Sequence, residues 1–369
     1  TVAVSQGVLA FGYDTALPGT GVTWEAGSFL GAANGATVTV DLGAVANPVF
    51  SLSPDAGSSI ALATPSDIVF GNAIIGEGTV RKTGTGLLKL TGSNSGHIVV
   101  QEGSVQVGNG TASIRWGGAG SSVTLENGTS LIIAGNSSGN SHHTIGSDLI
   151  LGTNASDAVS LKWVDASQAN ATNYQHDFTG TVTVNGAVSL VGRDNWAKEM
   201  GFTGTLTGAG SLTYSRGAGD GRYNANGKLI ISGDASGFTG MITMNASNGY
   251  SAGLDLRTSV SQGGVTLTSG TDTTGFAFMR VLGDVEIASL DGTANSQVGA
   301  VGGARTLTVG SGTYNGTLTD RGIVLAYGAT SIAYDESGVL SLTKVGDETL
   351  TLGGPVSYTG LKIGRASCR

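Results

Sequence analysis

The chain has 369 residues, of which 63 are glycine and 5 are proline. Only 12% of the residues are charged and 39% are hydrophobic, so the chain is too apolar and too weakly charged for a disordered polypeptide. The formal net charge is −8 and the lysines and arginines are scattered singly, so nucleic acid is not expected as a partner.

The two ends of the chain carry little targeting information. The first residues, TVAVSQGVLAFGYD, lack the basic start and apolar core of a signal peptide, so we expect residue 1 to be a mature or truncated end. No stretch approaches the roughly 20 apolar residues of a membrane helix, and no membrane-spanning segment is expected. Cys368 is the only cysteine, which excludes a disulfide framework and a thiolate metal site.

Short runs in which apolar residues alternate with threonine recur along the chain, each bounded by Gly, Asn, Asp or Ser. Such runs are typical of strands that bury one face and are separated by turns. In chain order they include TVTVDL (37–42), SVTLENG (122–128), TVTVNG (181–186), GSLTYS (210–215), KLIISG (228–233), GVTLTSG (264–270), RTLTVG (305–310) and ETLTLGG (348–354). The segment NWAKEM (195–200) comes nearest to a helical turn and is too short to form a helix.

A second pattern predicts a repeated corner. It reads NSGHIVV (94–100), FTGTVTV (178–184), FTGTLTG (202–208), FTGMITM (238–244), YNGTLTD (314–320) and YTGLKI (358–363). We expect the aromatic residue to pack inward, the small polar residue to turn the chain, and glycine to adopt a backbone angle that other residues resist. Strand, corner, strand, turn and strand, as in 88–107, form a rung of roughly 20 to 25 residues.

The alternation alone fits a two-sheet sandwich as well as a solenoid, and the repetition favours the solenoid. We therefore predict an all-β fold in which successive rungs stack.

Residues 82–110, KTGTGLLKLTGSNSGHIVVQEGSVQVGNG, resemble the passenger-associated transport repeat of bacterial autotransporters, also called the autotransporter-associated β-strand repeat. Ser95 stands where the family has an aromatic residue. Residues 344–361, KVGDETLTLGGPVSYTGL, resemble a second copy that keeps the aromatic residue as Tyr358. The resemblance implies a right-handed parallel β-helix, continuous over 1–362, in a protein exported from a Gram-negative cell to the cell surface or the medium.

The last seven residues, IGRASCR (363–369), break the composition abruptly. They are what a common sequencing adapter gives when it is translated, so we interpret them as a non-native tail and leave them out of the fold.

The sequence contains few candidate residues for hydrolysis or for metal binding. The nucleophile motifs GxSxG and GDSG are missing from the sequence, and a serine triad would have to use one of only four histidines, which are His97, His142, His143 and His176. His142 and His143 could hold a metal ion with Asp148, but adjacent residues on a strand point to opposite faces. We expect a solvated loop there.

The densest charge cluster lies in VGRDNWAKEMG and contains Arg193, Asp194, Lys198 and Glu199, with Trp196 as a candidate sugar platform. Carboxylate clusters serve polysaccharide-cleaving β-helices, yet a solvated loop that protrudes from the rod explains the same residues. The segment GAGDGRYNANG (217–227) resembles one Gly-Asp-rich calcium repeat, and such sites need several consecutive copies.

The sequence therefore predicts a structural or adhesive β-helical segment at the cell surface, with no catalytic, cofactor-binding or metal-binding residue. Cell-surface glycans or proteins are the expected partners, together with self-association through the open ends of the rod. Two alternatives stay open: a polysaccharide-active enzyme or phage tail-type depolymerase, and a passive stalk whose functional head lies outside this segment.

Overall fold

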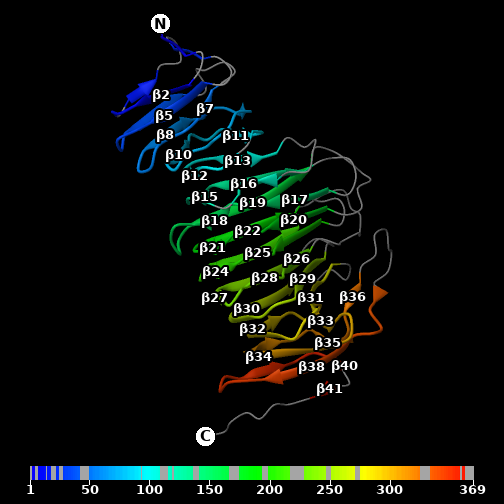
Figure 1. Cartoon of the computed structure of the whole chain (residues 1–369). Coiled ribbons are helices and arrows are strands. Elements are labelled where there is room, and N and C mark those ends of the chain that lie inside the picture. The colour runs from blue at the N-terminus through cyan, green and yellow to red at the C-terminus, as the bar shows by residue number, and fades with distance from the viewer. Residues whose placement is uncertain are drawn as a thin grey trace.

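The protein is a parallel β-helix whose strands stack in chain order from the N-terminus to the C-terminus (Figure 1). This computed structural model describes residues 2–4, 7–13, 15–17, 22–24, 28–41, 50–92, 94–108, 115–118, 120–135, 141–165, 174–192, 198–216, 228–246, 251–270, 275–324, 333–357 and 360–361. Within these ranges every strand pairing is parallel except that of β36 with β37. The all-β parallel β-helix predicted from the sequence is confirmed, and the two-sheet sandwich is wrong.

Three long parallel sheets form the sides of the solenoid. Sheet 1 contains β3 (Thr15–Leu17), β6 (Thr37–Asp41), β8 (Ser59–Ala63), β10 (Thr79–Thr83), β12 (His97–Val100), β15 (Ser122–Leu125), β18 (Asp148–Leu151), β21 (Val182–Val184), β24 (Leu206–Gly208) and β27 (Gly237–Phe238). Sheet 2 contains β9 (Ile68–Phe70), β11 (Leu87–Leu90), β13 (Ser104–Val107), β16 (Ser130–Gly135), β19 (Ala158–Asp165), β22 (Ala187–Gly192), β25 (Ser211–Arg216), β28 (Met241–Ala246), β30 (Val260–Ser269), β32 (Val285–Gly292), β34 (Ala304–Tyr314), β38 (Val339–Lys344) and β41 (Gly360–Leu361), with β39 (Leu350–Leu352) beside β34.

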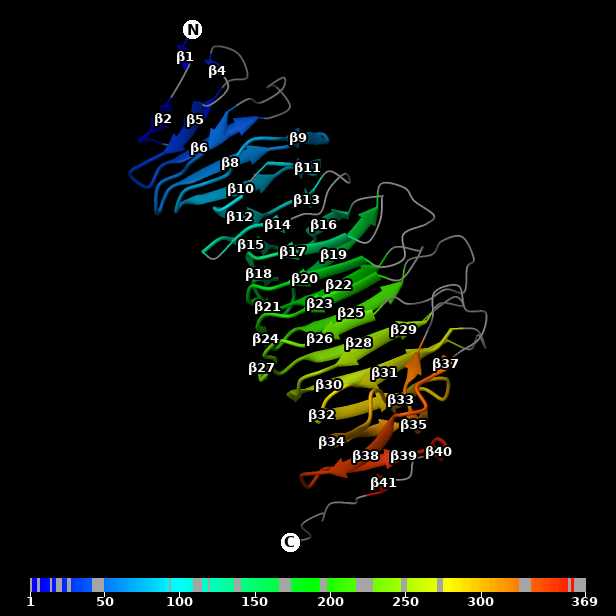
Figure 2. The ribbon, with the colours of Figure 1, turned by 45° about the vertical axis from the view of Figure 1, so that its right-hand side comes forward.

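Sheet 3 contains β14 (Arg115–Trp116), β17 (Ser141–Ile145), β20 (Tyr174–Phe178), β23 (Lys198–Phe202), β26 (Lys228–Ile231), β29 (Ala252–Leu256), β31 (Ala277–Val281), β33 (Gln297–Ala300), β35 (Thr317–Arg321) and β40 (Val356–Ser357). Smaller sheets join β1 (Val2–Val4) to β4 (Val22–Trp24), and β2 (Gly7–Phe11), β5 (Ser28–Ala32) and β7 (Ser51–Leu52). The hairpin of β36 (Ile323–Val324) and β37 (Ala333–Tyr334) lies near β31 and β33 (Figure 2).

Rung length varies along the chain. Hydrogen bonds between neighbouring rungs join residues that are 20, 22, 25, 30 or 33 positions apart. The predicted rung over 88–107 is wrong, because Leu88 on β11 pairs in register with Val105 on β13, so β13 already belongs to the next rung. Longer rungs carry extra residues between strands, and register shifts occur within β30, between Val260 and Gly264, and within β33, between Gly299 and Ala300.

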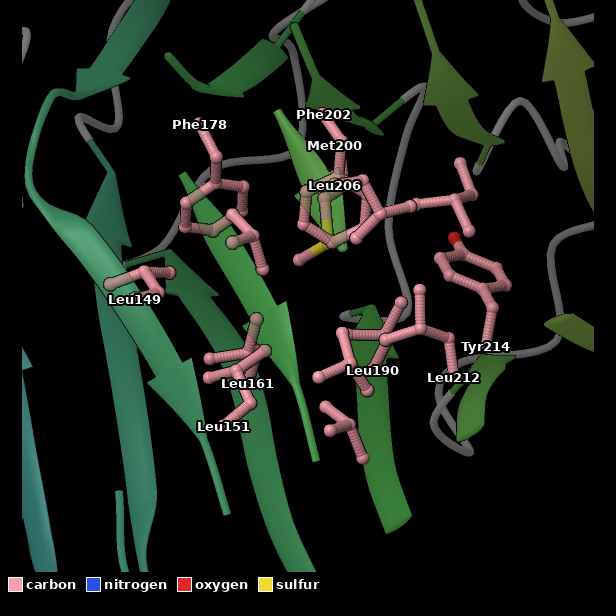
Figure 3. Close-up of a cluster of buried hydrophobic side chains, with 14 of the residues drawn as sticks. Leu149, Leu151, Leu161, Phe178, Leu190, Met200, Phe202, Leu206, Leu212 and Tyr214 are labelled. Carbon is pink, nitrogen blue, oxygen red and sulfur yellow. The ribbon is translucent and has the colours of Figure 1, made fainter. Parts of the chain in front are cut away.

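The core is a continuous column of apolar side chains between the three sheets. Strands such as β12 and β13 alternate between partly exposed and buried residues, so each strand sends every second side chain inward. In the middle rungs, Leu149, Leu161 and Phe178 enter the same core from sheets 1, 2 and 3 (Figure 3). A fully buried side chain of this size stabilises the fold by about 1.5–3 kcal/mol, and only the stacked neighbours make that burial complete.

Both copies of the predicted repeat begin with the same lysine corner. Lys82 Nζ donates to the carbonyls of Thr83 (3.3 Å) and Gly84, and Lys344 Nζ donates to those of Val345 (2.5 Å) and Gly346 (2.9 Å). The glycine has a positive φ in each copy, 78° at Gly84 and 72° at Gly346. The shared sequence K-x-G thus encodes one local structure, in which the ammonium caps the carbonyls of a left-handed turn.

The aromatic corners are confirmed in part. Phe178, Phe202, Phe238 and Tyr314 are all buried, as predicted. They do not form one column, because the first two end strands of sheet 3, Phe238 ends β27 of sheet 1 and Tyr314 ends β34 of sheet 2. The aromatic position of 82–110 is filled by Asn94, which is 7% exposed and bridges to Ile74, whereas Ser95 is exposed.

The predicted reason for the corner glycines is wrong. Gly180, Gly204 and Gly240 do not have a positive φ. A Cβ on Gly180 would lie 2.6 Å from the carbonyl oxygen of Ser147, and a Cβ on Gly204 would collide with the carbonyl of Gly180. Glycine is needed here because the backbone of the neighbouring rung occupies the space of a side chain, and not because of its backbone angle.

Small polar side chains hold successive rungs together where the strands end. Ser121 Oγ lies 2.7 Å from Ser147 Oγ, and Ser130 Oγ lies 2.7 Å from Ser160 Oγ. Several aspartates also accept a backbone N–H from the next rung, as Asp67 does from Leu87 (3.1 Å). The aspartate bonds satisfy backbone N–H groups that have no strand partner at the corner, and the serine pairs join side chains of neighbouring rungs.

We expect Gly180→Ala to lower the free energy of unfolding by about 1–3 kcal/mol, because the new methyl group overpacks the contact with Ser147. The matched control is Gly118→Ala, since a Cβ at Gly118 meets no atom within 4 Å and its φ is not positive. Denaturant midpoints of the two variants measure the difference. Equal midpoints would contradict the close-approach explanation.

The amine of Lys82 gives the fold a pH dependence. Burial lowers the pKa of Lys82 from 10.5 to about 8, and the nearby Glu102 carboxylate offsets part of that shift. Between these two pKa values the unfolded chain binds more protons than the native chain, so stability contributed by Lys82 rises with pH from about 8 to 10.5.

Between pH 7.5 and pH 10, the denaturant midpoint of the unmodified chain should therefore rise by more than the midpoint of Lys82→Met, because the variant lacks this amine. Lys89→Met, which changes a partly exposed lysine on β11, is the control for the loss of one amine. The same pH response in all three proteins would refute the assignment to Lys82.

Candidate functional site

A polar groove lies at the corner between sheets 3 and 1. Its volume is about 650 Å³. Its lining comes from the turns that follow β14, β17, β20 and β23. The lining residues are glycines, threonines and one aspartate: Gly117, Gly118, Gly120, Thr144, Gly146, Asp148, Thr179, Gly180, Thr181, Gly204 and Thr205.

The walls of this Gly/Thr groove are fixed by bonds between rungs. Gly146 N–H donates to the Trp116 carbonyl (2.9 Å), and Thr179 N–H donates to the Ile145 carbonyl (3.0 Å). Asp148 is exposed, and its Oδ1 accepts the N–H of Thr181 (2.7 Å). The inward side of the same corner is filled by Phe178 and Phe202, whose ring centroids lie 5.4 Å apart (Figure 3). The groove is therefore a rigid surface over a packed core.

A second polar feature lies on the outer face of sheet 3. Glu199, Lys228, Asp255 and Arg280 come from the successive strands β23, β26, β29 and β31, and their charges alternate in sign. We call these four residues the charged ladder. Lys228 Nζ lies 2.6 Å from Glu199 Oε1 and 3.8 Å from Asp255 Oδ2. Glu199 is in register with Lys228 and Asp255 with Arg280, while Lys228 is in register with Gly253, two positions before Asp255. Each charge still lies beside an opposite one, which stabilises the stack.

Asp255 is the buried centre of the charged ladder. Its side chain is 1% exposed, and Arg280 grips it with two bonds, Nε to Oδ1 at 2.6 Å and Nη2 to Oδ2. Arg280 Nη1 also donates to the carbonyl of Ile323 on β36 (3.4 Å), which ties the hairpin to sheet 3. A bidentate pair occupies both carboxylate oxygens, so Asp255 is engaged as a structural anchor.

Only part of the predicted charge cluster 193–199 can be placed. Arg193, Asp194 and Trp196 lie outside the described residues, and Lys198 begins β23. Glu199 joins Lys228 rather than a second carboxylate. Sequence reasoning missed Lys228, Asp255 and Arg280, because each belongs to a different rung and no local pattern links them.

The histidines differ from the prediction. The expected solvated loop at 142–143 is wrong, because both residues lie in β17, and His143 is fully buried. His143 pairs in register with His176 on β20, and the two rings stack with centroids 4.8 Å apart. His97 is partly exposed, and its Nδ1 lies 2.9 Å from Ser122 Oγ. Because side chains alternate along β17, His143 points inward as Ile145 does. The polar sequence GNSSGNSHH gave no sign that this segment forms a strand with a buried face.

Metal ligands do not gather in the part of the chain that the structure describes: no group of three His, Cys, Asp or Glu residues there could hold an ion. The Gly-Asp-rich segment 217–227 and the tail 363–369 lie outside the described residues. Nor do the described ranges contain a helix long and apolar enough to cross a membrane.

Comparison of the chain with family models, curated proteins and solved structures yields no match. Functional inference therefore starts from the fold, the groove and the charged ladder.

Removal of the Asp255 carboxylate should destabilise the chain strongly. Asp255→Ala leaves Arg280 and Lys228 without their shared partner in a buried setting, which we expect to cost about 3–5 kcal/mol of unfolding free energy. The exposed pair of Arg321 and Glu336 (3.0 Å) provides the control, since Glu336→Ala should cost at most about 1 kcal/mol. Thermal unfolding of both variants measures the contrast, and similar losses would show that burial does not strengthen the charged ladder.

Proposed function

We propose that the chain is a structural and adhesive β-helical segment of a bacterial surface or secreted protein of the autotransporter type. The observation that carries the proposal is the lysine corner, which recurs with the same bonds at Lys82 and Lys344 in the two segments that resemble the passenger repeat. A repeat that encodes a stackable corner suits a long rod that grows by adding rungs.

The outer surface supports an adhesive role. On sheet 2 a column of hydroxyl side chains runs through seven successive strands in register: Ser104, Ser130, Ser160, Ser189, Thr213, Thr243 and Thr266. Ser130 is buried and bonded to Ser160, and the other six are partly exposed. Hydroxyls both donate and accept hydrogen bonds, so such a face can engage polar surfaces without a fixed charge pattern. The net charge of −8 disfavours polyanionic surfaces as partners.

The alternative of a polysaccharide-cleaving enzyme gains no support from the charged ladder. Hydrolysis of a glycosidic bond uses two carboxyl groups that face the scissile bond. Here Glu199 pairs with Lys228, and both oxygens of Asp255 are bonded to Arg280. We therefore place adhesion first.

Adhesion can be tested with beads that carry the purified chain. We expect such beads to be retained on bacterial or animal cell layers well above beads that carry the heat-denatured chain, with no release of reducing ends from added polysaccharides. Release of reducing ends would favour the enzyme. Equal retention of native and denatured beads, without sugar release, would favour a passive stalk and contradict the adhesive role.

A further inference from the structure

We propose that the Gly/Thr groove is a binding site for a neutral oligosaccharide. This inference rests on the proposed adhesive function and names the class of ligand that one site would take. The groove volume of about 650 Å³ lies in the range of small-ligand sites, roughly 300–1,000 Å³.

The chemistry of the lining matches a ligand rich in hydroxyl groups. Thr144, Thr181 and Thr205 supply hydroxyls that can donate and accept, and the hydroxyl of Thr179, which donates to the Ile145 carbonyl (3.4 Å), can still accept. Asp148 Oδ1 is fixed by the Thr181 N–H, which leaves the second oxygen of this exposed carboxylate for a ligand hydroxyl. Such a charge-assisted bond is about twice as strong as a neutral one.

Other ligand classes fit the same residues less well. Among the groove-lining residues there is no lysine or arginine, and the one charge is negative, which disfavours an anionic ligand. Asp148 is the single carboxylate there, whereas calcium takes 6–8 oxygen ligands. No large apolar side chain lines the groove, so an apolar ligand would gain little from burial.

An added peptide strand is also disfavoured. β17 pairs with β14 on one side and β20 on the other, and β20 pairs with β17 and β23. Strand addition needs an exposed edge, which β17 and β20 do not offer, and β14, the end strand of sheet 3 that pairs only with β17 among the described strands, has just two residues. A neutral sugar chain needs no such edge.

The groove is ready to bind without rearrangement. Gly118 N–H donates to Ser121 Oγ (3.0 Å), and Ser121 Oγ lies 2.7 Å from Ser147 Oγ in the next rung. Glycines along the floor let a ligand approach the backbone closely. Since the walls are already ordered, little conformational entropy is lost when a ligand binds.

The test uses the full chain and an array of neutral oligosaccharides built from glucose, galactose, mannose and N-acetylglucosamine, followed by calorimetry on any that bind. We expect at least one to bind. Gly118→Trp should abolish that binding, because the indole would project into the groove from a position where a Cβ meets no atom within 4 Å. Asp148→Ala should weaken it about tenfold through the lost charge-assisted bond.

Ala155→Trp, on an exposed turn after β18, is the matched control and should bind like the unmodified chain. Circular dichroism checks that each variant is folded, and the Asp148 variant tests the groove independently if Gly118→Trp misfolds. If both groove variants still bind the glycan, the groove is not the binding site, although the proposed adhesive function is not contradicted. If the beads adhere to cells but the chain binds no glycan on the neutral array, the proposed oligosaccharide site is likewise contradicted and the adhesive function is not. If the chain fails in both assays, both proposals are contradicted.

Discussion

The structure depends on one constraint: successive rungs lie in parallel register, so a strand residue inside a sheet has an equivalent neighbour about 4.8 Å above and below it. Along the core this constraint is favourable, since Leu149 packs on Val182 and Val182 on Leu206. At the corners the same register crowds the chain, because the backbone of the neighbouring rung occupies the space that a side chain would need. Glycine at positions such as Gly180 and Gly204 relieves that crowding, because it has no side chain.

The same constraint explains how this chain handles polar groups. A column of like charges would repel along its whole length, and the charged ladder avoids repulsion by alternating Glu199, Lys228, Asp255 and Arg280. Elsewhere the columns contain hydroxyls, which satisfy one another in either direction, as Ser130 and Ser160 do. A chain with few charged residues can therefore build a long polar surface.

Function in such a rod concentrates where the rungs differ. Strands must repeat to stay in register, while the turns between them vary more in length and composition, except at glycines such as Gly180 and Gly204 where two rungs meet. The Gly/Thr groove is built from four successive turns of this kind, and the β36–β37 hairpin, held by Arg280, is another local addition to the outer face. Both features modify the surface and leave the core column unchanged.

The sequence by itself determined the strands and the stacked solenoid, because the alternation and the repeated corner are local patterns of a few residues, whereas the capping of carbonyls by Lys82 and Lys344 emerged only from the structure. It also placed Phe178, Phe202, Phe238 and Tyr314 in the core. Only the tertiary structure decided which rungs put Asp255 beside Arg280, stacked His143 on His176, and opened the groove beside Asp148. Rung-to-rung neighbours are separated by different numbers of residues, from 17 between Leu88 and Val105 to 38 between Leu318 and Val356, so no fixed spacing in the sequence reveals them.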